Sequence, residues 1–299
     1  MSRGEPRRHG LELAATETAE HPLAGLFVPG MRQVFRWSSE QGRELLLIDH
    51  PRCRAIFARQ GGQLLHFQPR GERPMLWCAA RWPRLGAIRG GVPVCWPWFG
   101  RHPQESGWPH HGWARLTDWR LLERESSEAG VRLRWRLALH DWEVELQAEL
   151  GDELALTLTT RHADQEPCML SQALHAYWRI SDIARVAVLG LEGASGQDLL
   201  NRQRIIQQGE LRPMEGCHRV FDHDGPLRLQ DAGWQRRLRI DTGGSPNTVV
   251  WHPGGRPLAD VGWKEGLGFA SIEAAACGTG GQVLAPGETA RIQLRARVE

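Results

Sequence analysis

The chain has 299 residues, and its 37 basic residues are nearly balanced by 35 acidic ones, which gives a formal net charge of +2. This balance argues against a general nucleic-acid or membrane-surface binder, which normally carries a large uncompensated positive charge. Hydrophobic residues make up 41% and charged residues 24% of the chain, a composition typical of globular rather than disordered proteins.

The N-terminal segment is polar and mixed, and we predict a flexible arm over residues 1–24. The longest apolar run near this end covers residues 45–48, which is too short for a transmembrane helix or a signal peptide. The six cysteines lie far apart and form no Cys-x-x-Cys pair, so a structural zinc site is disfavoured. With no export signal, reduced thiols in the cytoplasm are the simpler expectation.

Strand patterns follow along the rest of the chain. Runs of strand-forming or strictly alternating residues are separated by glycine and proline, and we find no long amphipathic helix and no low-complexity linker. The predicted strands are 44–48, 63–67, 131–139, 142–150, 154–160, 186–189, 248–251 and 292–298. Many short strands with turn signals predict an all-β fold, a sandwich or a barrel, formed as one domain by residues 25–299.

The clearest predicted hairpin turns at His140-Asp141. The runs on either side alternate with period two, as half-buried antiparallel strands do, and a two-residue link is short enough for a tight turn. Counting back from this turn pairs two arginines with two glutamates, Arg136 with Glu145 and Arg132 with Glu149. Opposed charges of this kind add ~0.2–1 kcal/mol per pair and favour this register.

Residues 88–115 do not fit a strand. The segment contains prolines and four of the 14 tryptophans in the chain, which predicts a rigid loop. Gly90-Gly91 allows a close backbone approach, and Arg89 and Arg115 could both point into the resulting cleft. A packed loop with tryptophan as filler accounts for the same residues equally well.

A histidine and a glutamate further along lie among apolar residues. His175 stands in Leu-His-Ala-Tyr-Trp, and Glu273 stands in Ser-Ile-Glu-Ala-Ala-Ala-Cys. A histidine in such a setting is more often a hydrogen-bonded core residue than a catalyst. A glutamate would be costly to bury without a partner, so Glu273 must be exposed, paired or functional.

Several common catalytic motifs are missing from the sequence. It contains no G-x-G-x-x-G, no G-x-x-x-x-G-K-[ST], no G-x-S-x-G and no H-E-x-x-H. Nucleotide binding by a P-loop and serine hydrolysis by a nucleophile elbow therefore have no support.

Four runs together resemble the glucose-6-phosphate 1-epimerase branch of the aldose 1-epimerase family. They are Ile-Arg-Gly-Gly-Val-Pro-Val-Cys-Trp-Pro-Trp-Phe-Gly (88–100), His-Gly-Trp-Ala-Arg (111–115), Leu-His-Ala-Tyr-Trp (174–178) followed by Ser-Asp-Ile (181–183), and Ile-Glu-Ala-Ala (272–275). The resemblance runs from about residue 25 to the end, in the family's order. It implies a galactose-mutarotase-like β-supersandwich of antiparallel sheets and a cytoplasmic enzyme that requires no cofactor and no metal.

The resemblance also implies site residues. The family's catalytic histidine and glutamate match His175 and Glu273, while Arg89 and His111 match residues that line the sugar site. Arg115, which ends the second run, is a candidate for phosphate binding or for structural pairing. A tryptophan face can stack on the apolar side of a pyranose ring, which makes Trp96 a substrate-binding candidate, with Trp98 and Trp113 beside it; core packing stays equally open for each.

One position departs from the family pattern. Relatives commonly carry an acidic residue before the Arg-Val pair, whereas this chain has His218 before Arg219 and Val220. The change would replace an acceptor for a sugar hydroxyl. Asp222 or Asp224 could compensate, or the substrate preference could differ.

The chemistry of anomer exchange suggests how the matched residues would act. A base must take the proton of the C1 hydroxyl while an acid protonates the ring oxygen; the open aldehyde then rotates and closes on its other face. We hypothesise that Glu273 is the base and His175 the acid, since an imidazole with a pKa of about 6.5 can donate and recover a proton near neutrality. We expect the nearby carboxylate to favour the protonated imidazole.

These expectations combine into a monomeric hexose-6-phosphate mutarotase. Its substrate would be a small-molecule sugar phosphate, D-glucose 6-phosphate or a related aldose 6-phosphate, and we expect no nucleic acid and no membrane as partner. Two alternatives stay open on the same fold: an aldose 1-epimerase of neutral sugars, and a carbohydrate-binding protein without catalysis.

Overall fold

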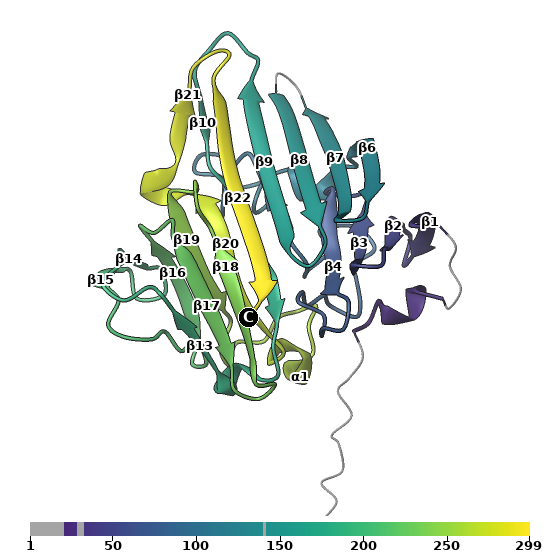
Figure 1. Ribbon diagram of the computed structural model, residues 1–299. Coiled ribbons are helices and arrows are strands. Elements are labelled where there is room, and N and C mark those ends of the chain that lie inside the picture. The colour runs from purple at the N-terminus through teal and green to yellow at the C-terminus, as the bar shows by residue number, and fades with distance from the viewer. Residues whose placement is uncertain (1–20, 29–32, 140–141) are drawn as a thin grey trace, which may run out of the picture.

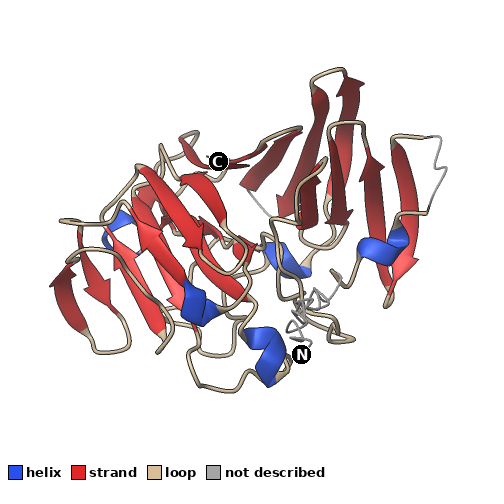
Figure 2. Cartoon of the chain, turned by 60° about the horizontal axis from the view of Figure 1, so that its bottom comes forward, coloured by secondary structure: helices blue, strands red, loops and turns tan. Residues whose placement is uncertain are grey.

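The computed structural model describes residues 21–28, 33–139 and 142–299, and over these ranges nearly all regular structure is strand (Figure 1). The longest helix there is the four-residue α1 (Trp263–Gly266), and the other helical segments are 3-10 turns of three residues. Figure 2 shows these short helices at the margins of the strands. In the described ranges, no helix is long and apolar enough to cross a membrane. The all-β prediction is confirmed.

One eight-stranded antiparallel sheet contains the predicted hairpin. Its strand order is β13-β17-β18-β22-β9-β8-β7-β6. The bounds are β6 (Arg120–Ser127), β7 (Gly130–Leu139), β8 (Trp142–Leu150), β9 (Leu154–His162), β13 (Val186–Leu189), β17 (Pro226–Asp231), β18 (Arg236–Asp241) and β22 (Thr289–Val298). The inner face of this sheet supplies a large part of the main hydrophobic core.

A second eight-stranded sheet packs its inner face into the same core. Its strands follow the order β15-β14-β16-β19-β20-β11-β5, and β12 pairs with the end of β20. The bounds are β5 (Val94–Cys95), β11 (Gln172–Leu174), β12 (Tyr177–Arg179), β14 (Ser195–Asp198), β15 (Gln203–Ile206), β16 (Cys217–Phe221), β19 (Asn247–His252) and β20 (Phe269–Ala276). We call it the central sheet, because its other face carries the site described below.

Two smaller sheets complete the described strands. One has the order β1-β2-β3-β4 and the other pairs β10 with β21. The bounds are β1 (Phe35–Glu40), β2 (Arg43–Asp49), β3 (Cys53–Ala58), β4 (Gln63–Pro69), β10 (Cys168–Leu170) and β21 (Gln282–Leu284). This set of antiparallel sheets confirms the galactose-mutarotase-like β-supersandwich.

The register of the predicted hairpin is confirmed. Arg136 lies opposite Glu145 and Arg132 opposite Glu149, and Leu139 pairs with Trp142. The linking residues, His140-Asp141, lie outside the described residues. The alternation arises because the odd positions of β7 enter the core, where Trp135 is fully buried, while the even positions carry arginines on the outer face.

The predicted N-terminal arm falls mostly outside the described residues, which begin at residue 21. In its described remainder, Leu23 and His21 are buried, and Leu23 packs in a cluster with β2 and β3. Residues 21–24 therefore belong to the packed body of the protein. The flexibility of the arm as a whole stays a prediction.

Candidate active site

The candidate site lies on the outward face of the central sheet. Alternate residues of β20 point to opposite faces: Ile272 enters the main core, whereas Ser271 and Glu273 lie on the other face. Pairing places Trp251 of β19 on one side of Ser271 and Tyr177 of β12 on the other. The sheet thus brings together residues that are about 100 positions apart in the chain.

His175 lies in the break between β11 and β12. Its backbone N–H donates to the Pro93 carbonyl at 3.0 Å, and the N–H of Tyr177 donates to the Gly91 carbonyl at 2.8 Å. The Arg-Gly-Gly run thereby anchors the break. Gly91 is required there for the protein's own packing, because a Cβ at this residue would lie 2.0 Å from the Leu64 carbonyl oxygen.

His175 and Glu273 form the pair that the sequence predicted. The Nδ1 atom of His175 lies 3.4 Å from Oε1 of Glu273, and the two side chains are 9% and 1% exposed. Within the described part of the chain, the other carboxyl oxygen, Oε2 of Glu273, is buried without a hydrogen-bond partner. A buried carboxyl oxygen without a hydrogen-bond partner is costly.

The electrostatics of the pair differ from our expectation. Burial raises the pKa of Glu273 well above its ordinary value, against a lowering effect of its hydrogen bond with Ser271. Burial also lowers the pKa of His175 well below its ordinary value, and the nearby Arg115 and Arg89 lower it further. The expected protonated imidazole is therefore disfavoured, because desolvation penalises both charged forms.

The rings around His175 hold it in place. Tyr177 stacks on it with ring centroids 4.8 Å apart and an interplanar angle of 6°. The rings of His111 and Trp251 meet it edge-on, at 5.6 and 5.9 Å. His111 is therefore placed at the site as predicted, with its backbone at φ +64° and its Nδ1 accepting from the Gly100 N–H at 3.0 Å.

Arg89 reaches the same site through an ion pair that the sequence did not reveal. Its Nε lies 3.0 and 2.9 Å from the two carboxylate oxygens of Asp260, and its Nη1 donates to the hydroxyl of Tyr177 at 3.4 Å. Asp260 belongs to a loop without a recognisable motif, so only the fold could identify it. Together Arg89 and Asp260 offer both donors and an acceptor to a sugar hydroxyl.

A group of cationic and imidazole side chains surrounds the pair. Arg115 donates from Nη2 to the His110 carbonyl at 2.6 Å. Burial lowers the pKa of His110, and the positive charges of Arg115 and Arg101 lower it further. His218 faces the site side of the sheet, opposite Trp251. The lowered pKa values of His110 and His218 favour neutral imidazoles, so Arg115 is the cation of this group.

Asp222 and Asp224 do not directly replace the acidic residue that relatives carry at the position of His218. Asp222 lines a neighbouring cavity with His218, but its carboxylate accepts from Ser195 Oγ at 2.9 Å. Asp224 is exposed in the loop between β16 and β17. Asp260 is the partly exposed acid that the fold brings to Arg89 instead.

Trp96 does not take part in the site, which corrects our prediction. Alternation along β5 turns Cys95 toward the site face and sends Trp96 into the main core, where it is fully buried and contacts Trp142 edge-on at 5.5 Å. The prediction that residues 88–115 avoid the sheet is also wrong at Val94–Cys95, which pairs with β11.

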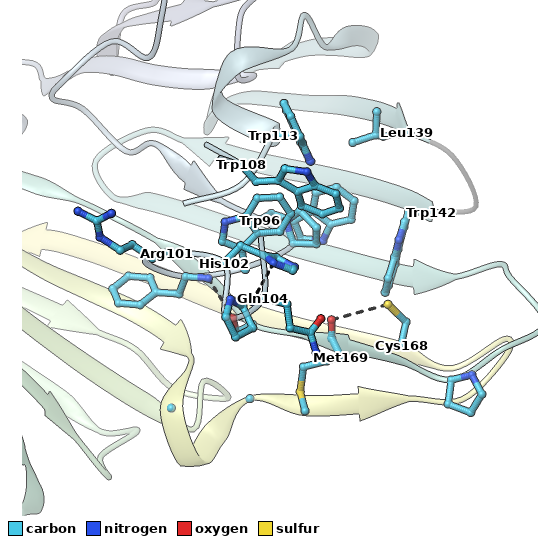
Figure 3. A pocket seen from close by; sticks show the side chains of 18 residues that line it. Trp96, Arg101, His102, Gln104, Trp108, Trp113, Leu139, Trp142, Cys168 and Met169 are labelled. Carbon is cyan, nitrogen blue, oxygen red and sulfur yellow. Dashed lines mark hydrogen bonds between the residues drawn. The ribbon is translucent and has the colours of Figure 1, made fainter. Parts of the chain in front are cut away.

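Trp96 and the other three tryptophans of the loop line a cavity of about 900 Å³ whose lining includes neither His175 nor Glu273. Figure 3 shows Trp96, Trp108 and Trp113 grouped on one side of it, with Cys168 and Met169 opposite. Trp98 stacks on Trp108 at 5.3 Å and donates from its indole to the Pro109 carbonyl at 3.0 Å. Trp98 is therefore packed within the loop, whereas Trp108 and Trp113 are 46% and 36% exposed.

Comparison with known proteins agrees with this geometry. The family model described as aldose 1-epimerase matches residues 44–297. A protein of Escherichia coli K12 named "Putative glucose-6-phosphate 1-epimerase" is 33% identical over 225 residues, 71% of this chain and 74% of its own length. A protein of the same name from the plant Cenchrus ciliaris is 28% identical over 291 residues, 89% of this chain and 79% of its own.

Solved structures show the same fold. A crystal structure from Salmonella typhimurium, described as a putative mutarotase, superposes with a TM-score of 0.83 at 26% identity, over 91% of this chain and 95% of its own. A galactose 1-epimerase from Lactobacillus acidophilus superposes with a TM-score of 0.66 at 13% identity, over 89% and 98%. The family model matches residues 44–297, which is most of this chain. The chain therefore belongs to the aldose 1-epimerase family.

Proposed function

We propose that the protein is a hexose-6-phosphate mutarotase, which interconverts the α and β anomers of D-glucose 6-phosphate or a related aldose 6-phosphate. The observation that carries the proposal is the buried contact between Glu273 and His175 at 3.4 Å, with Oε2 of Glu273 unsatisfied among the residues described. An acid–base pair without a nucleophile suits ring opening, which needs proton transfer alone. The names of the curated relatives favour a 6-phosphate substrate.

In this proposal the two residues act on opposite sides of the anomeric centre. Glu273 accepts the proton of the C1 hydroxyl through Oε2, and His175 donates a proton to the ring oxygen through Nε2, since its Nδ1 contacts Glu273. The C1–O5 bond breaks and the aldehyde forms. Rotation about C1–C2 and the reverse transfers then produce the other anomer, so neither residue is changed at the end.

We assign the two predicted arginines to different parts of the substrate. The charge of Arg89 is already paired with that of Asp260, so we expect Arg89 to bind sugar hydroxyl groups. Arg115 has a carbonyl partner at His110 and no carboxylate within ion-pair distance among the residues described, which leaves its charge for phosphate. His110 and His218 would add hydrogen bonds at the same end. The charge of Arg115 therefore favours a phosphorylated over a neutral sugar.

Anomer exchange measured by NMR or polarimetry tests the proposal. Glucose 6-phosphate and glucose are each compared with their own uncatalysed rate, because free sugars mutarotate spontaneously. Acceleration that is much greater with the phosphate is the expected result. Equal or greater acceleration of glucose would indicate a neutral-sugar aldose 1-epimerase, and binding without acceleration would indicate a carbohydrate-binding protein; either result would overturn the proposal.

We also propose that the enzyme acts as a monomer in the cytoplasm. All six cysteines are free thiols, which is the state that a reducing compartment maintains. Light scattering in solution tests the monomer: the expected mass is that of one chain, 33.7 kDa.

A further inference from the structure

The hydroxyl of Ser271 lies between the two members of the acid–base pair. Its Oγ is 3.3 Å from Oε1 of Glu273 and 3.1 Å from Nδ1 of His175. It is also 2.8 Å from the carbonyl oxygen of Ala176. Ser271 is fully buried, so its three possible partners are all groups of the protein.

A hydroxyl has one proton to donate and two lone pairs that can accept. Ser271 therefore cannot donate to the carbonyl, the carboxyl group and the imidazole at the same time. If it donates to the Ala176 carbonyl, both Glu273 and His175 must donate to it. If it donates to one member of the pair, the other must donate to it, and the Ala176 carbonyl loses this hydrogen bond. The protonation states of the two residues are thus linked through a hydroxyl that can turn from one to the other.

We propose that Ser271 is a positioning residue that relays a proton from Glu273 to His175 during each ring opening. The proposal rests on the function proposed above. It adds a third protein group to the reaction, one that does not touch the substrate and acts through the two that do.

The relay transfers four protons, and each acceptor atom receives one. The C1 hydroxyl proton passes to Oε2 of Glu273, and the proton on Oε1 of Glu273 passes to Oγ of Ser271. The original hydroxyl proton of Ser271 passes to Nδ1 of His175, and the proton on Nε2 of His175 passes to the ring oxygen as the C1–O5 bond breaks. Ring closure on the other face reverses every transfer.

The relay explains how a pair in this environment can work. A carboxylate beside an imidazolium would be an ion pair with side chains 1% and 9% exposed, and desolvation opposes such a pair. With the relay, Glu273 keeps one proton and His175 keeps one proton before and after ring opening, so neither residue needs to carry a charge. This agrees with the raised pKa of Glu273 and the lowered pKa of His175, for both of which burial is the main cause.

Substitutions at Ser271 test the relay by anomer exchange with glucose 6-phosphate. Ser271→Ala removes the hydroxyl, and we expect kcat to fall about 10-fold to 100-fold while KM stays within about twofold, because the residue does not contact the substrate. Ser271→Cys keeps a transferable proton in nearly the same place and should recover part of the rate. Ser245→Ala is the matched control: this serine is also buried, and its hydroxyl contacts the Gln293 backbone.

The rate in mixtures of H₂O and D₂O provides a second readout that a purely structural role would not change. Several protons in flight predict a curved dependence on the deuterium fraction for wild type and a straighter one for Ser271→Ala. An unchanged kcat in Ser271→Ala, or the same curvature in both proteins, would refute the relay. If wild type itself shows no acceleration, the proposed function fails instead, so the two failures are distinguishable.

Discussion

At the scale of single residues, the site depends on burying groups that water would otherwise ionise. The carboxyl group of Glu273 and the ring of His175 face one another on a sheet whose neighbouring positions are aromatic or aliphatic. That environment disfavours both charges, and it also leaves Oε2 of Glu273 without a partner in the described structure. In the proposed function, a substrate hydroxyl would supply the partner that this oxygen lacks.

Glu273→Gln and His175→Asn should each abolish most of the proposed activity. Both changes nearly preserve shape but remove a group that takes up and releases the proton, and general acid–base groups contribute about 10²–10⁴-fold. We expect kcat for glucose 6-phosphate to fall in this range, measured by anomer exchange. Retention of the wild-type rate by either variant would show that the mechanism uses other residues.

Glu273→Gln should also stabilise the protein above neutral pH. Because the folded pKa of Glu273 is raised above 4.5, the folded state binds more protons than the unfolded state, and stability is lost as pH rises through the interval between these pKa values. Glutamine cannot ionise, so we expect Glu273→Gln to be more stable than wild type at pH 8, and we expect the difference to disappear near pH 4. Thermal unfolding at the two pH values measures it, and a variant less stable than wild type at pH 8 would contradict the prediction.

At the scale of elements, short strands and one loop that is fixed by backbone hydrogen bonds bring the site residues together. The loop between β5 and the 3-10 turn at Ala114–Leu116 returns to the sheet at Trp96, where Trp113 N–H donates to the Trp96 carbonyl at 2.8 Å. Gly112 permits this return, because its φ is +73° and a Cβ would lie 1.9 Å from that carbonyl oxygen. The position of His111 beside His175 therefore depends on the residue that follows it.

Gly112→Ala should displace His111 and destabilise the protein. We expect a loss of more than about 3 kcal/mol in the free energy of unfolding and a fall in activity, because a backbone overlap is added to the cost of a left-handed conformation. Gly100→Ala is the control from the same loop: its φ is +82°, yet nothing lies within 4 Å of the added Cβ, so about 1–2 kcal/mol is expected. Urea unfolding compares them, and equal losses would show that the overlap is relieved without cost.

At the scale of the whole molecule, two large sheets share one core, and charged residues occupy the surfaces outside it. Three arginines of β7 face outward and pair with glutamates on neighbouring strands, Arg132 with Glu149 at 3.3 Å among them. The inward residues of the same strand pack in the main core, where Trp135 stacks on Phe57 at 5.7 Å. Most of the stability should therefore come from the core and little from the ion pairs.

Two substitutions on β7 test this division. Trp135→Ala should cost about 3–5 kcal/mol, because it leaves a large cavity between the sheets. Arg132→Ala should cost less than about 1 kcal/mol, since both members of its ion pair are more than half exposed and such pairs contribute little. Denaturant unfolding measures both, and a larger loss for Arg132→Ala would reverse the proposed order.

The strands that the sequence predicts include alternating ones, such as β7 and β8, and almost uniformly buried ones, such as β4 and β19. The alternating strands β17 and β18 were missed. The alternation in β7 and β8 gives their bounds and register, because only one face of that sheet is buried. Every residue of β20 is buried, so its sequence shows no alternation, although it carries Ser271 and Glu273. The short strands β11 and β12 were missed as well, since three residues are too few for a pattern.

The sequence by itself determined the all-β class and the register of the main hairpin, and the family resemblance at 88–100, 111–115, 174–178 and 272–275 supplied the two candidates for the proposed acid–base pair. Only the tertiary structure decided which side chains surround that pair. It added Asp260 and the central place of Ser271, placed Trp96 in the core, and disfavoured the expected protonated form of His175. The physical reason is that strand pairing and burial join residues far apart in the chain, and both properties arise only when the sheets have packed.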